Sequence, residues 1–149
     1  MAIFQLVTEQ FLPVSKETAW CYISSPANLR HITPPGMGFE IIFPDGIQKM
    51  YPGMMILYRV KPLAGIPLTW LTEITHVSEN NYFVDEQRAG PYSLWHHEHH
   101  LVETPGGVNM RDIVTYRLPL GKLGDLANRF LVRKKLKAIF EYRKKALEK

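Results

Sequence analysis

The chain has 149 residues, of which 46% are apolar, and a net charge of +4. Its length predicts one domain, spanning residues 1–149, with a sizeable core. The lone Cys21 excludes an internal disulfide framework and is typical of a reducing compartment. The first ten residues lack a signal-peptide pattern, and no window reaches the roughly 18 apolar residues of a membrane span. We therefore expect a cytoplasmic protein without a transmembrane segment.

The charge is distributed unevenly along the chain. Residues 122–149 hold ten Lys/Arg and three Asp/Glu, a balance of +7, whereas residues 1–121 hold eight and eleven, a balance of −3. The basic residues of the last segment include Arg129, Arg133, Lys134, Lys137, Lys144 and Lys145. They predict either a solvated helix face or a weak contact with an anionic surface. No nucleic-acid motif or aromatic stacking platform lies nearby, so we expect no nucleic-acid partner.

The first forty residues predict a strand followed by two short helices. Apolar residues occupy both faces of the strand at 2–12, which predicts partial cover on both sides, and Pro13 ends it. Ser15 is a favourable N-cap for a helix that continues to about Ser24. Ser25-Pro26 begins a second short helix in the same way, because proline is favoured at the first helical position.

Residues 38–118 predict an antiparallel meander of further strands. The predicted strands span residues 39–43, 54–60, 68–76, 82–87, 92–103 and 108–118. Short connections containing Gly, Pro or Asn separate most of them, and short connections between neighbouring strands produce hairpins.

One long helix is predicted from Asp125 to about Leu147. Gly121 and Gly124 precede it, and the Asp125 carboxylate can cap its first turn. The two halves of this helix present apolar residues on different sides, which predicts different surroundings at its two ends. Seven strands and a single long helix to cover them predict an α+β fold in which a curved antiparallel sheet wraps around the helix. Such curling leaves a space between sheet and helix.

Six stretches of the sequence carry a resemblance to a known family. They are Asn28-Leu29 through Ile32-Thr33-Pro34-Pro35, Phe83 to Gln87, Gly90-Pro91-Tyr92, Trp95-His96-His97-Glu98-His99, Asp112 to Tyr116 and Phe140 to Arg143. With the order of elements, which covers essentially the whole chain, they resemble the START-like helix-grip superfamily, also called SRPBCC. That superfamily includes plant pathogenesis-related proteins, lipid-transfer domains and polyketide aromatase/cyclases. The nearest resemblance is to a bacterial group labelled cyclase/dehydrase-like or cell-division-inhibitor-like. It implies a ligand cavity and transfers no catalytic mechanism.

Four histidines surround Glu98 in the strand at 92–103. Because alternate residues of a strand face opposite sides, one face carries Trp95, His97, His99 and Leu101. A loop at 104–107 would pair Glu103 with Val108. His99 then lies opposite Asp112, His97 opposite Val114 and Trp95 opposite Tyr116. The partner face is the more apolar one of its strand, so we predict that both sets point inward. Its residues are Met110, Asp112, Val114, Tyr116 and Leu118.

This register predicts a pair of His99 and Asp112 inside an apolar cavity. A carboxylate fixes the tautomer of a neighbouring imidazole and can raise its pKa, which suits general acid–base chemistry on a polyketide-like substrate. The alternative is that His97, His99 and Asp112 form a satisfied polar network that holds the two strands in register.

The same residue types also allow a metal site. Two histidines at i and i+2 plus a carboxylate are a plausible zinc set, either in His97, His99 and Asp112 or in the outward trio His96, Glu98 and His100. His-X-His is common by chance beside other histidines, and no cysteine pair accompanies either set. We therefore predict no metal and no other cofactor.

The predicted function is binding of a small hydrophobic or amphipathic ligand between sheet and helix, such as a lipid, an aromatic or a polyketide-like molecule. The ligand would enter near residues 121–124. We predict that the ligand-binding residues are Tyr58, Trp70, Tyr82, Trp95, Met110, Val114, Tyr116, Leu126 and Phe130. The alternatives are a cyclase/dehydratase-type enzyme that uses His99 and Asp112 with His97, and a protein-interaction module that uses the basic helix face.

Overall fold

The computed structural model describes residues 2–46, 49–63 and 65–148. The strands are β1 (Phe4–Leu12), β2 (Glu40–Phe43), β3 (Met55–Leu63), β4 (Ile66–Ser78), β5 (Tyr82–Ala89), β6 (Leu94–Thr104) and β7 (Gly107–Arg117). The helices are α1 (Lys16–Ile23), the 3₁₀ turns η1 (Pro26–Arg30) and η2 (Pro35–Met37), α2 (Gly121–Ala127), the π-helical turn η3 (Asn128–Val132) and α3 (Arg133–Leu147).

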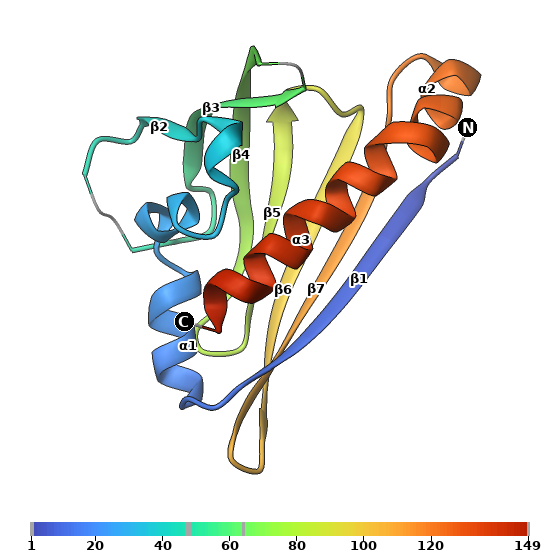
Figure 1. Cartoon of the computed structure of the whole chain (residues 1–149). Helices are drawn as coiled ribbons and strands as arrows, with labels where there is room; N and C mark the ends of the chain where they lie inside the picture. The colour runs from blue at the N-terminus through green and yellow to red at the C-terminus, as the bar shows by residue number, and fades with distance from the viewer. Residues whose placement is uncertain (1, 47–48, 64, 149) are drawn as a thin grey trace.

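The strands form one antiparallel sheet in the order β1-β7-β6-β5-β4-β3-β2. The register shifts within the β2–β3, β3–β4 and β4–β5 pairs, and such irregularities increase the local twist of a sheet. The sheet curves, and α3 crosses its concave side diagonally (Figure 1). The predicted α+β helix-grip fold with seven strands is therefore confirmed.

The predicted register between β6, which carries the histidines, and β7 is also confirmed. Glu103 pairs with Val108, and His99 lies opposite Asp112. His97 lies opposite Val114 and Trp95 opposite Tyr116. The short Thr104–Gly107 turn leaves a single alignment in which the apolar alternation of both strands faces the core.

The short helices after β1 follow the sequence prediction only in part. The Ser15 side chain accepts a hydrogen bond from the Thr18 backbone N–H at 3.1 Å, as an N-cap should. Ser25 makes no side-chain cap, and the segment after it is a 3₁₀ turn of five residues, η1. The outer face of β1 also differs from the prediction, because Val7 and Phe11 are exposed on it.

The long helix begins earlier than predicted, and Asp125 does not cap it. Leu120 occupies the N-cap position with a left-handed backbone (φ 72°), and α2 starts at Gly121. A Cβ on Gly124 would collide with the Pro119 carbonyl, so glycine allows the chain to fold back closely enough to begin the helix here.

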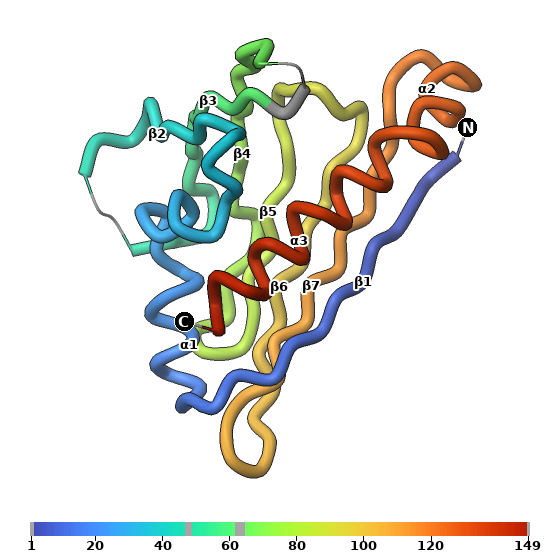
Figure 2. Tube along the Cα trace, viewed as in Figure 1, coloured from blue at the N-terminus to red at the C-terminus, as the bar shows by residue number. Residues whose placement is uncertain are grey.

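The core has two parts, which lie toward opposite ends of the strands. One lies between α1 and the sheet and includes Trp20, Ile56, Ile74 and Met110. The other lies under α3 and includes Trp70, Trp95, Tyr116, Leu136 and Phe140. The far end of α3 is fixed to β1 by a hydrogen bond from Gln10 Nε2 to the Lys144 carbonyl at 2.8 Å. The N-terminal end of β1 is seen near α2, and the C-terminal end of α3 near α1 (Figure 2).

Candidate functional site

A cavity of about 360 Å³ lies between the concave face of the sheet and the C-terminal helical segment. Aromatic rings form much of the sheet wall. Tyr58 and Trp70 stack with centroids 5.8 Å apart, and Trp70 meets the edge of Trp95 at 5.1 Å. The helical wall consists of Leu123, Gly124, Ala127, Val132, Lys135, Leu136, Ile139 and Arg143. Most of the lining is apolar, as expected for a small-molecule site.

A polar cluster interrupts this apolar lining. Asp85 of β5 and His97 and His99 of β6 line the cavity. Asp112 of β7 lies directly behind the two imidazoles. The ring centroids of His97 and His99 are 3.7 Å apart, and Phe83 stacks on His99 at 4.0 Å. Four titratable side chains from three adjacent strands therefore form one buried group.

Each of the two carboxylates lies close to one ring nitrogen of each histidine. His97 Nε2 donates to Asp112 Oδ1 at 2.8 Å, and His99 Nδ1 lies 3.0 Å from the same oxygen. His99 Nε2 lies 2.6 Å from Asp85 Oδ2, and His97 Nδ1 is 3.6 Å from it. Since both nitrogens of His99 contact carboxylate oxygens, both bonds form only when that ring is an imidazolium.

The directions of the pKa shifts agree with an imidazolium at His99 and a neutral imidazole at His97. Burial lowers the pKa of His99, but the hydrogen bonds to Asp112 and Asp85 outweigh burial and raise it above 6.5. Burial, followed by the charge of His99, lowers the pKa of His97. Burial alone would raise the pKa of Asp112, yet the hydrogen bonds from His97 and His99 hold it well below its usual range.

Two buried donors near this cluster have no hydrogen-bond partner among the described residues. They are Nε1 of Trp70 and Nε of Arg143, and both residues line the cavity. The Arg143 guanidinium lies over the Phe140 ring at 4.9 Å. Burial alone would raise the pKa of Asp85, but His97 and His99, and to a smaller extent the charge of Arg143, lower it. A cavity with unpaired donors favours a ligand that carries hydrogen-bond acceptors.

The predicted site residues divide into three groups. Tyr58, Trp70, Trp95, His97 and His99 line the cavity. Met110, Asp112, Val114 and Tyr116 are buried behind that lining as core. Tyr82, Leu126 and Phe130 do not line it: Tyr82 packs against His100, while Leu126 and Phe130 are 53% and 70% exposed.

The outward position of Phe130 follows from the π-helical turn, whereas Leu126 precedes that turn in α2. Ala127 and Val132 both line the cavity although they are five residues apart, which is the spacing of a π turn rather than an α turn. The extra residue moves the inward position from 130 or 131 to 132. Asn128, buried at the start of this turn, accepts a hydrogen bond from Tyr116 Oη at 2.7 Å.

Sequence reasoning missed Asp85 and Arg143 as site residues. In the segment from Tyr82 to Gln87, three apolar or aromatic residues are followed by three polar ones, so no alternation indicates which side Asp85 faces. Arg143 is one of many basic residues in the last helix, so its charge alone did not distinguish it as a site residue. Both residues belong to stretches that carried the family resemblance, which was the available signal.

The outward histidines have partners of their own. His96 Nδ1 contacts Glu86 Oε1 at 2.7 Å, and His100 Nε2 contacts Glu98 Oε2 at 2.9 Å. These side chains are about one-third exposed and lie on the opposite face of β6 from the cavity. They form a row of paired histidine and glutamate side chains at the surface, which resembles the buried cluster in composition only.

No protein-family model and no curated protein matches the chain. Several solved structures are similar to it. An uncharacterized protein from Rhizobium leguminosarum has a TM-score of 0.71 at 15% identity, over 99% of this chain and 95% of that one. CV1439 from Chromobacterium violaceum has a TM-score of 0.73 at 10% identity, over 97% and 94%. Ara h 8.0201 has a TM-score of 0.62 at 17% identity, over 98% of both chains.

These similarities establish the helix-grip fold and nothing beyond it. Structural likeness at such low sequence identity carries no function with it. Among the described residues, no helix combines the length and the apolar character needed to cross a bilayer.

Proposed function

We propose that this chain is a START-like protein of the SRPBCC type that binds a small amphipathic molecule in the cavity under α3. The observation that carries the proposal is the cavity itself, about 360 Å³ lined mainly by aromatic and aliphatic side chains. That volume is within the range of small-ligand sites, which begins at about 300 Å³. Similarity to helix-grip structures of nearly equal length is consistent with it.

The polar groups of the cavity support an amphipathic rather than a purely apolar ligand. The Arg143 guanidinium and the Trp70 indole N–H can donate to an oxygen of the ligand, and the imidazolium of His99 adds a charged group beside them. A lipid, aromatic or polyketide-like molecule with a carbonyl, hydroxyl or carboxylate oxygen fits this lining.

The entrance lies at the α2 end in this proposal. Leu120 and Leu123 line the cavity and are also 77% and 69% exposed, so the lining continues to the surface there. Exposed apolar residues continue along the segment to Leu126, Phe130 and Leu131. Contiguous exposed apolar side chains of this kind mark sites of membrane or protein contact.

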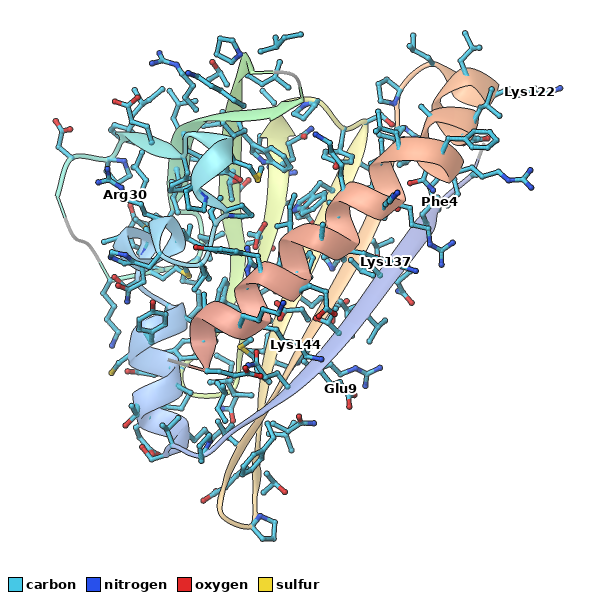
Figure 3. The ribbon with its side chains drawn as sticks, in the orientation of Figure 1. Phe4, Glu9, Arg30, Lys122, Lys137 and Lys144 are labelled. Carbon is cyan, nitrogen blue, oxygen red and sulfur yellow. The ribbon has the colours of Figure 1, made fainter. Side chains whose placement is uncertain are left out.

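Basic residues flank the entrance and support contact with an anionic membrane surface. Lys122, Arg129, Arg133 and Lys134 are exposed among the apolar residues. Lys122 extends outward from α2, whereas Lys137 and Lys144 follow it along α3 (Figure 3). Apolar side chains interspersed with Lys and Arg are typical of segments that lie at a bilayer interface. The ligand would then be exchanged with the membrane.

Native mass spectrometry of the purified protein tests ligand binding directly, because a retained molecule identifies its own class. Binding of 8-anilino-1-naphthalenesulfonate, an aromatic anion, provides a second readout. Ile139→Trp adds volume at a half-buried position of the lining and is expected to weaken dye binding at least tenfold. Val102→Trp, on an exposed position of β6, is the matched control. Equal dye affinity in both variants would place the dye outside the cavity and contradict the proposal.

A second candidate function is acid catalysis by His99, favoured by the two carboxylates that hold its proton beside the cavity. In a cyclase or dehydratase the imidazolium would donate that proton to a substrate oxygen, while Asp112 keeps the ring oriented. Once a turnover assay exists, Asp112→Asn should lower kcat, at most by the roughly 10²–10⁴-fold that a general acid such as His99 usually contributes. Unchanged turnover would end this candidate.

A further inference from the structure

The buried cluster has the atoms and spacing of a metal site. Asp85, His97 and His99 each offer one potential ligand atom, and these three atoms all lie within 4.8 Å of one another. Asp85 Oδ2 lies 2.6 Å from His99 Nε2 and 3.6 Å from His97 Nδ1. Tetrahedral zinc with bonds of about 2.0–2.1 Å holds its ligands roughly 3.3 Å apart. Small side-chain rotations therefore open a position that fits an ion.

Asp112 occupies the place of the outer carboxylate in a histidine metal site. It contacts Nε2 of His97 and Nδ1 of His99, which are the ring nitrogens that face away from Asp85. A carboxylate that accepts from the far nitrogen of a ligating histidine fixes its tautomer and leaves the near nitrogen with a free lone pair. Here one carboxylate oxygen performs this task for both rings.

Contrary to the prediction from the sequence, we propose that Asp85, His97 and His99 bind one divalent first-row transition-metal ion, with Asp112 as the residue that orients both imidazoles. Two carboxylates contribute −2 and the ion +2, so the occupied cluster is neutral. Two imidazoles and one carboxylate leave coordination positions open, and all three ligands line the cavity. An oxygen of the bound molecule could fill one of those positions.

The proposal does not depend on which amphipathic molecule the cavity takes. Binding of the ion displaces the proton from His99 Nε2 to solvent. The protonated cluster described above and the metal-bound cluster are thus alternative states of the same four side chains. Nitrogen ligands make Ca²⁺ and Mg²⁺ poor candidates, because these ions take oxygen ligands.

The test uses the full chain without an affinity tag, stripped with chelator and dialysed. Titration with Zn²⁺, followed by elemental analysis after gel filtration, should show one ion per chain. Titration with Co²⁺ should give visible absorption bands of low-symmetry coordination. Asp112→Asn should lower affinity about 10–100-fold, as for other outer-shell partners. His99→Gln and Asp85→Asn should lower it further.

His96→Gln and His100→Gln are the matched controls, because they remove imidazoles of the same strand that face the other way. Both should keep wild-type stoichiometry and affinity. One measurement needs no variant: bound Co²⁺ should shift the ring-proton resonances of His97 and His99 more than those of His96 and His100. Failure of the stripped, folded wild type to take up stoichiometric Zn²⁺ would overturn the proposal. So would Co²⁺ shifts centred on His96 and His100.

Discussion

Asp112 is the most constrained residue of the site, because it is 3% exposed and ionised. A buried carboxylate must be paired, and even a well-paired buried ion cluster often stabilises a protein no more than well-packed apolar residues of similar volume would. A group of four titratable side chains beside a cavity is therefore better explained by function than by stability. Both the acid–base candidate and the metal proposal follow from this reasoning.

Asp112→Asn tests how strongly the cluster depends on that charge. Asparagine keeps the shape but removes the negative charge that pairs with the His99 imidazolium, and breaking one partner of a buried ion pair costs about 3–5 kcal/mol. We expect a loss of this size in the free energy of unfolding of the metal-free protein, measured by urea denaturation.

Glu98→Gln is the control for that experiment, since Glu98 pairs with His100 on the exposed face of β6. Partly exposed pairs contribute about 0–1 kcal/mol, so this variant should remain near wild type. Equal losses in the free energy of unfolding for the two substitutions would show that the buried cluster contributes no more to stability than the surface pair.

The segment α2–η3 is the element on which the proposed entrance depends. Gly124 begins the helix against the Pro119 carbonyl, and the π turn brings Val132 rather than Phe130 to the cavity. Two local features, a close backbone contact and one extra residue in a turn, decide which side chains line the cavity and which face outward.

Gly124→Ala tests the close contact at the start of the helix. The new methyl group would collide with the Pro119 carbonyl, which the chain relieves only by shifting α2, and overpacking of this kind costs about 1–3 kcal/mol. Gly36→Ala is the matched control, because no atom lies within 4 Å of its added Cβ. Thermal denaturation of both variants should show a lower Tm for Gly124→Ala alone.

Membrane contact through this element predicts binding to anionic vesicles. The double variant Leu126→Ser/Phe130→Ser should lower co-sedimentation with vesicles of phosphatidylcholine and phosphatidylserine at least fivefold. Its stability should change little, because exposed residues away from the core contribute within about 0.5 kcal/mol each. Neutral vesicles should bind weakly throughout.

Val7→Ser/Phe11→Ser removes two other exposed apolar side chains, 43% and 50% exposed, from the outer face of β1 and should retain vesicle binding. An equal loss of vesicle binding in this control would indicate nonspecific hydrophobic adsorption of the protein rather than binding through the surface of α2–η3.

Across the whole molecule, stability is expected to fall toward the α2 end. The segment α2–η3 has only Gly124 and Asn128 buried among its described residues, whereas α3 has Leu136 and Phe140 inserted between helix and sheet. Elements with few buried apolar contacts open locally at low free energy. The entrance proposed for the cavity therefore coincides with the part of the helical cover that is held least tightly.

Hydrogen–deuterium exchange tests this gradient. Amides of α2–η3 should exchange faster than those of α3, and those of β6 and β7 should be slowest. Addition of 8-anilino-1-naphthalenesulfonate should slow exchange of α2–η3 more than exchange of the sheet. Uniform protection along the helical segment would contradict local opening as the route of entry.

The sequence alone determined the α+β class, the number of strands and the pairing of His99 with Asp112. Each depends on short-range information: apolar alternation shows which side of a strand is inward, and a short turn fixes how two neighbouring strands align. His97 and His99 could be placed on the inner face for the same reason.

Only the tertiary structure decided that Asp85 joins the cluster, that Arg143 reaches the cavity and that Leu126 and Phe130 face outward. Asp85 lies in a strand segment without alternation, and Arg143 acquires its role only when the end of α3 is fixed against β1. The inward side of the last helix depends on the Gly124 contact and on the π turn at Asn128. The placement of all these side chains depends on contacts between segments that meet only after folding. The local periodicity of the sequence cannot encode such contacts.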